Sequence, residues 1–102
     1  ALLAGANLSE ASLIGAYLRQ ANLTEADLHR GVLTGADLSE AILNQADLSR
    51  ANLAGAYLLK ASLHKAHLLR ANLQDVFLLR ANLSEANLRG ADLQRADLSG
   101  AY

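Results

Sequence analysis

Two histidines stand at a spacing that can serve metal binding. His64 and His67 are three residues apart, which on a helix would bring both imidazoles to one face. Zinc needs three or four converging ligands, yet Lys65 lies between the pair and the next carboxylate along the chain is Asp75. His29 stands alone in a polar stretch, as a surface residue would. We therefore predict neither a metal site nor any other cofactor.

Short polar side chains recur through the sequence, and their carboxylates and amides are candidates for catalytic groups. Their regular spacing instead predicts a structural task, because Asp and Asn hydrogen-bond to neighbouring backbone where a chain turns. No serine is flanked as a nucleophile, and no glycine-rich loop is suited to cradle a phosphate. We expect no catalytic residue and no enzyme activity. The recurring residues are Asn7, Asn22, Asp27, Asp37, Asp47, Asn52, Asn72, Asn82, Asn87, Asp92 and Asp97.

The composition excludes several classes of function. Ten acidic and nine basic residues give a net charge of −1, which is too balanced to predict a nucleic-acid partner. The absence of cysteine excludes disulfides, thiolate nucleophiles and zinc–thiolate sites. No apolar run reaches the length of a bilayer span, and the first ten residues lack the pattern of a signal peptide. These observations predict a cytoplasmic protein without a membrane partner.

The elements that position these side chains follow from a five-residue repeat. Leucine occupies every fifth residue from Leu3 to Leu98, and the residue two places earlier is alanine except at Gly31 and Val76. So strict a period predicts one small structural unit stacked on itself. Nothing interrupts the frame, so we expect a single domain over residues 1–102. In each pentapeptide we number the places first to fifth, with alanine first and leucine third.

The period excludes a long helix and a long flat strand. On a helix, a five-residue step turns the leucine by about 140°, so the leucines would form no stripe. In a strand, successive Ala-x-Leu pieces would point to opposite sides. The sequence therefore predicts short extended pieces joined by corners, with Ala and Leu inside. Six of the seven glycines hold the fifth place, where a turn can require positive φ.

The pentapeptides ANLSE, ADLSR, ANLRG and ADLQR match the pattern A-(D/N)-L-x-x, so the chain resembles the pentapeptide-repeat family over essentially its whole length. The resemblance implies an all-β fold, a right-handed quadrilateral parallel β-helix with four pentapeptides per coil. Twenty pentapeptides then make about five coils. A narrow interior would make Val76 overfilled and Gly31 underfilled. The family is abundant in cyanobacteria, which implies a bacterial source.

Four pentapeptides per coil would stack residues that are twenty apart and divide the surface into four faces. On the fourth face, Tyr57 would lie under Phe77 and Leu59 under Leu79, which makes an apolar patch with a basic rim. Such a patch is either a protein-binding surface or packing between neighbouring coils, and the sequence leaves both open. The candidate binding residues are Tyr17, Tyr57, Leu59, Lys60, Phe77, Leu79 and Arg80.

On the second face, Arg30, Arg50 and Arg70 would form one stack, with Asp27 and Asp47 nearby. The stack is either a solvated ladder of charges or a site for an anion such as phosphate. Because the nearby carboxylates and water can offset the repulsion, we predict the solvated ladder.

The resemblance implies a non-enzymatic scaffold or interaction module with an unknown protein partner. Neither end of the repeat carries a cap, so we also expect a homodimer through the open coil ends, or cover from further sequence. One alternative is a DNA-mimicking modulator of DNA gyrase, as some family members are. The central leucines, the net charge of −1 and the arginine stack depart from those acidic rods. The other alternative is a spacer segment of a longer protein.

Overall fold

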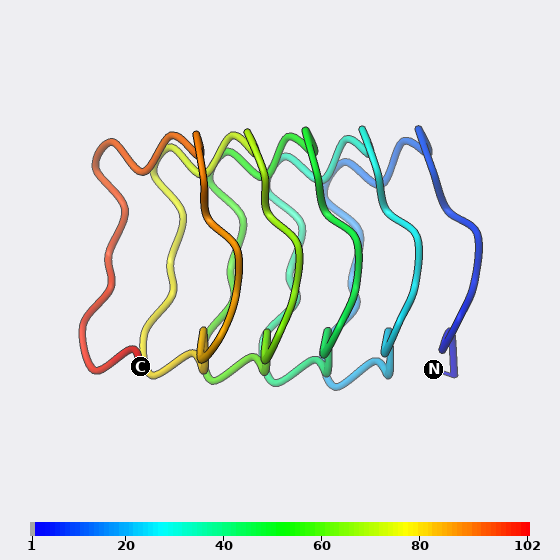
Figure 1. The fold of residues 1–102 in the computed structure, drawn as a ribbon, viewed down its shortest axis with the longest axis horizontal. Helices are drawn as coiled ribbons and strands as arrows, with labels where there is room; N and C mark the ends of the chain where they lie inside the picture. Colours follow the sequence, from blue (N-terminus) through cyan, green and yellow to red (C-terminus); the bar gives the residue numbers. More distant parts are fainter. Residues whose placement is uncertain (1) are drawn as a thin grey trace.

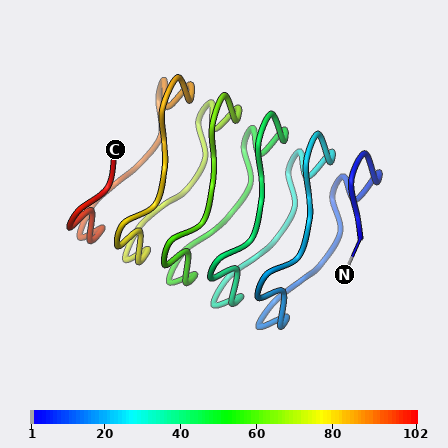
Figure 2. The same cartoon turned by 90° about the horizontal axis from the view of Figure 1, so that it is seen from below.

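The computed structural model describes residues 2–102, and within them the chain forms neither a helix nor a continuous strand. Single-residue parallel bridges stand at the second place of the pentapeptides, from Leu2↔Asn22 to Phe77↔Asp97. Every bridge joins residues that are twenty apart. Four consecutive pentapeptides therefore complete one circuit, and the circuits stack into a rod with the termini at opposite ends (Figures 1 and 2).

In the inner circuits, the N–H groups of the second, third and fifth places form the hydrogen bonds between successive circuits. In residues 26–30, the Leu28 N–H donates to the backbone oxygen of Asp47 at 2.7 Å on the next circuit. The Arg30 N–H donates to the backbone oxygen of Ser49 at 3.0 Å, also on the next circuit. The Asp27 N–H donates to Ala6 at 2.9 Å on the preceding circuit. This regular bonding explains the absence of proline, which would remove a donor from the ladder.

The corners are turns in which the first-place N–H donates to the third-place C=O of the preceding pentapeptide. The residue at the fifth place has positive φ in every pentapeptide, with 56–61° at the fourteen non-glycine residues and 63–71° at the six glycines. The positive φ at the fifth place confirms the prediction made from the six glycines that hold this place. The structure extends it to Glu, Gln, Asp, Lys and Arg, for which a positive φ costs roughly 1 kcal/mol and which the stacked circuits nevertheless impose.

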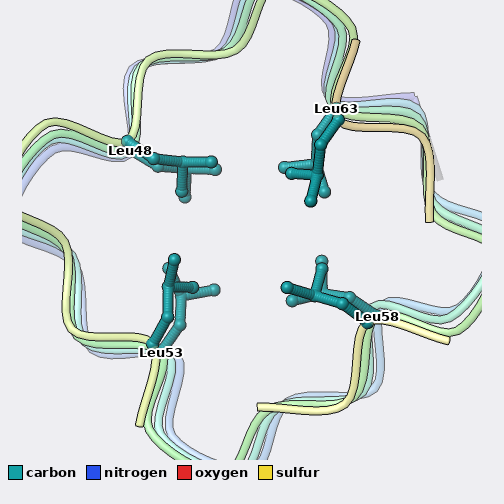
Figure 3. A pocket seen from close by; sticks show the side chains of 8 residues that line it. Leu48, Leu53, Leu58 and Leu63 are labelled. Carbon is teal, nitrogen blue, oxygen red and sulfur yellow. The ribbon is translucent and has the colours of Figure 1, made fainter. Parts of the chain in front are cut away.

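The interior of the rod is a column of leucines. Leu48, Leu53, Leu58 and Leu63 come from four consecutive pentapeptides and point toward one another from four sides (Figure 3). The space left between these four leucines and the next four, up to Leu83, is about 10 Å³, so the core is filled. Each buried leucine contributes roughly 1.5–3 kcal/mol, so this column dominates stability.

The two exceptions in the alanine column are accommodated differently. Val76 is fully buried, and its turn bond to Leu73 is 3.3 Å, whereas the other turn bonds measure 2.9–3.1 Å. The larger side chain therefore opens its corner, as predicted for an overfilled place. At Gly31, an added Cβ would lie 3.0 Å from the Leu28 oxygen and 3.4 Å from Leu33 Cδ1. An added methyl group would therefore meet its neighbours closely, so little space is left unfilled and the prediction of an underfilled place is wrong.

Burial falls toward both ends of the rod. The leucines of the column are at most 1% exposed from Leu23 to Leu78, whereas Leu98 is 43% exposed. Whether a second copy or further sequence covers such an end stays a prediction. Within residues 2–102 there is no helix that could cross a membrane.

Candidate protein-binding face

The regularly spaced Asp and Asn residues act as corner supports, which confirms their predicted structural role. Each of the eleven accepts, through Oδ1, the backbone N–H two residues further along at 2.9–3.1 Å. This fourth-place N–H is the one that the bonds between circuits leave out. For Asp97, the hydrogen bonds from Ser99 hold the pKa of the carboxyl below its ordinary value. Such a carboxylate stays ionised at neutral pH and is unsuited to act as a general acid.

The histidine pair lies on two different faces. His64 is engaged through both ring nitrogens, with Nδ1 2.7 Å from Ser84 Oγ and Nε2 3.5 Å from Glu85 Oε2. His67 bridges Asp47 and Asn87 on the next face. In the described part of the chain, no three His, Cys, Asp or Glu side chains gather where they could hold a metal ion.

The fourth face of the rod carries an aromatic stack at its centre. Tyr57 and Phe77 form a parallel bridge, and their rings stack with centroids 4.9 Å apart and planes inclined by 4°. The stack leaves Tyr57 47% and Phe77 41% exposed. With Leu59 and Leu79 they line a shallow depression of about 310 Å³. The predicted stacking of Tyr57 under Phe77 is confirmed, and much of the patch still faces solvent. The fourth face comprises residues 16–20, 36–40, 56–60, 76–80 and 96–100.

The end of the depression nearer the N-terminus is polar. Arg19 Nη1 lies 3.7 Å from Asp37 Oδ2, and Arg19 Nη2 lies 3.4 Å from Glu40 Oε1. Ser39, which is buried, completes this end. Sequence reasoning missed Arg19, Asp37 and Ser39. The twenty-residue offset would have found Asp37 and Ser39, because they lie one circuit from Tyr57 and Leu59.

Three of the predicted residues lie outside the depression. Lys60 and Arg80 are exposed at the adjacent corner, and the ion pairs within residues 2–102 include neither of them. Tyr17 is exposed on the same face but two circuits from Tyr57, with Asp37 bridged between them. The structure therefore gathers four predicted residues, places two cations at their rim and leaves Tyr17 apart.

The repeat that builds this face also assigns the chain to a family. The family description "Pentapeptide repeats (8 copies)" matches residues 1–39, 32–68 and 66–102. The chain belongs to the pentapeptide-repeat family. No curated protein matches it.

Solved structures of other pentapeptide-repeat proteins share this β-helix. The chain is 40% identical to Rfr23 from the cyanobacterium Cyanothece 51142, with a TM-score of 0.83, over 83% of this chain and 58% of that one. It is 33% identical to a protein of the Arabidopsis thaliana thylakoid lumen, with a TM-score of 0.88, over 89% and 63%. QnrB1, a plasmid-mediated fluoroquinolone resistance protein, is 22% identical, with a TM-score of 0.62, over 98% and 59%. The chain thus spans about three fifths of each of these structures.

The fourth face departs from the pentapeptide-repeat pattern where it is most apolar. Tyr57 and Phe77 occupy second places, where the pattern has Asp or Asn. Without an Oδ1 acceptor, the N–H groups of Leu59 and Leu79 have no acceptor among residues 2–102. In the regular pentapeptides a second-place side chain accepts this N–H, whereas Tyr57 and Phe77 leave both donors without that acceptor. The face therefore combines an apolar stack, two backbone donors and a basic rim.

Proposed function

We propose that this pentapeptide-repeat chain is a non-catalytic binding module that presents its fourth face to a protein partner. The scaffold is a right-handed quadrilateral β-helix of about five coils. The proposal depends on one observation: Tyr57 and Phe77 stack on each other and still leave nearly half of each side chain exposed. Clustered aromatics next to cations are typical anchors of protein interfaces.

The chemistry of the face defines the partner that it suits. An apolar side chain can fill the depression between the aromatic stack and Leu59. A carboxylate beside that side chain can pair with Lys60 or Arg80, which have no acidic partner among residues 2–102. A carbonyl or carboxylate oxygen can also accept the N–H groups of Leu59 and Leu79. We therefore expect a segment in which an apolar residue and an acidic residue stand close together.

Packing between circuits is the competing explanation of the same residues. A stacked aromatic pair contributes about 0.5–1.5 kcal/mol beyond its buried area, which is reason enough for Tyr57 and Phe77 to share a column. Packing alone, however, does not require the basic rim. The two explanations differ in what happens when the patch is removed without loss of the fold.

The test is affinity capture from a lysate of the organism that encodes the chain. The native protein is compared with a quadruple variant, Tyr57→Ser, Leu59→Ser, Phe77→Ser and Leu79→Ser, whose circular dichroism must match the native spectrum. Ile42→Ser is the matched control, because Ile42 is 40% exposed at a second place on another face. A protein captured by the native and control chains and lost by the quadruple variant supports the proposal. Identical capture by all three reduces the patch to packing.

Modulation of DNA gyrase has no comparable support in this chain. At 22% identity, the likeness to QnrB1 shows the fold alone. The net charge of −1 and the stack of Arg30, Arg50 and Arg70, which the ion pairs within residues 2–102 do not include, are unlike a mimic of duplex DNA. We expect no inhibition in a gyrase supercoiling assay at micromolar protein, and inhibition there would overturn our choice of function.

A further inference from the structure

The second face carries three arginines around an open depression of about 570 Å³. Arg50, Arg70 and Arg89 line it together with Leu69 and Gly90. The Arg50 N–H donates to the Leu69 oxygen and the Arg70 N–H donates to the Arg89 oxygen, each at 2.8 Å. These bonds place the three arginines on neighbouring circuits of the same face, where they line one depression.

No carboxylate lines this depression. The ion pairs within residues 2–102 include none of the three arginines. On the same face, Asp47 stands three residues before Arg50 and accepts the Ser49 N–H at 2.9 Å. Burial acts to raise the pKa of Asp47, but the Ser49 hydrogen bonds and the neighbouring histidines lower it overall. Because guanidinium groups stay protonated, the depression holds three positive charges without a negative group of its own.

Two further features open the depression to a ligand. Gly90 stands above Arg70 in the fifth-place column, and a Cβ there would lie 3.1 Å from Arg70 Cγ. Glycine at this place therefore leaves room for the Arg70 stem, and Arg70 stays exposed. His67 occupies the second place where the repeat has Asp or Asn, so the Leu69 N–H has no acceptor in the part of the chain that the structure describes. A backbone donor thus joins the three side chains.

We propose that this depression binds a doubly charged phosphate group, in place of the solvated ladder of charges that the sequence predicts for the arginine stack. Arginine forks donate two parallel hydrogen bonds to phosphate oxygens, and a tetrahedral dianion offers acceptors for several forks and for a backbone N–H at once. Chloride is spherical and singly charged, so it offers no such set of oxygen acceptors. The phosphate comes either from inorganic phosphate or from a phosphorylated side chain of a partner. This site is independent of the fourth face, because it shares no residue with that depression.

The test is an NMR titration of the native chain with inorganic phosphate at constant ionic strength, with chloride as the reference anion. We expect saturable shifts of the Leu69 amide and of the Nε–H signals of Arg50, Arg70 and Arg89. Arg70→Gln should weaken binding about tenfold or more, because it removes a charge-assisted fork. Equal, non-saturating shifts with phosphate and chloride would overturn the proposal.

Lys65→Gln is the matched control. Lys65 also holds a fifth place, with φ 58° against 56° at Arg70, and the ion pairs within residues 2–102 do not include it. If Lys65→Gln weakens phosphate binding as much as Arg70→Gln, binding reflects general charge and the site is refuted. A peptide with one phosphoserine, compared with its unphosphorylated twin, distinguishes the sources. Tighter binding than inorganic phosphate assigns the site to a phosphorylated partner, and equal binding assigns it to the free ion.

Discussion

Truncation of one central leucine should destabilise the rod far more than the same change at its end. Leu58 is 1% exposed and is one of four leucines that point toward one another from four sides (Figure 3). Leu58→Ala removes three buried carbon groups, which costs about 2.4 kcal/mol at ~0.8 kcal/mol each. The unfilled cavity adds roughly 2 kcal/mol, because measured leucine-to-alanine costs reach about 5 kcal/mol where a site cannot collapse.

The structure explains why the Leu58 site cannot collapse. The Leu58 N–H donates to Phe77 at 2.7 Å, and the Leu58 oxygen accepts the Ala61 N–H at 3.1 Å. The backbone is thus held from the next circuit and from its own corner. We therefore expect a loss of about 4 kcal/mol in the free energy of unfolding, measured by chemical denaturation and followed by circular dichroism.

Leu98→Ala is the matched control, at the same third place but with 43% exposure. Its expected cost is about 1 kcal/mol, because Leu98 buries less apolar surface on folding than Leu58 does. The space that the variant vacates is also open to solvent, so no cavity forms. Equal losses for the two variants would refute the reasoning, since they would show that the leucines stabilise the rod independently of their burial in the column.

Four smaller predictions follow from the corners. Asn72→Ala should cost about 1 kcal/mol in denaturation, because the N–H two residues on loses its acceptor at 3.0 Å, while Asn72→Asp should be near neutral. Gly35→Ala should cost about 1 kcal/mol although nothing lies within 4 Å of the added Cβ, because φ is 65°; a stabilised variant would contradict the backbone argument. Val76→Ala should cost less than about 1 kcal/mol, since closing the corner offsets the lost methyl groups, and a large loss would show that the 3.3 Å turn bond carries no strain. The pKa of Asp37 is lowered, chiefly by its hydrogen bond from Ser39 and also by Arg19. Its contribution to the free energy of unfolding is therefore present above the ordinary pKa of 3.8 and is lost as the pH falls below that value. In acid titration, the stability of Asp37→Asn should fall less steeply with pH than that of the native chain, and an unchanged slope would exclude this contribution.

Much of the fold could be predicted because each pentapeptide repeats the same local instructions. The leucine period excluded helix and flat strand, and the recurring Asp and Asn residues indicated corners. The central aromatic stack was predictable too, since Tyr57 and Phe77 are twenty residues apart. Arg19 was not, because its role depends on a long side chain that reaches Asp37 and Glu40 in one particular rotamer. The sequence offered an anion site as one interpretation of the arginine stack, but it did not indicate the depression, which also needs Arg89 and a glycine at place 90 that leaves room for the Arg70 stem.

The sequence by itself determined which residues turn inward, that Asp and Asn side chains bond neighbouring backbone at the corners, and which residues share a face. These properties follow from a five-residue period and from the hydrogen-bonding chemistry of single residues. Only the tertiary structure decided that charged residues such as Arg50 and Glu40 adopt positive φ, that the Val76 corner opens, and that three arginines share one depression without a carboxylate. Those outcomes depend on forces between circuits, because the ladder of inter-circuit hydrogen bonds and the leucine column together override the preference of an individual residue.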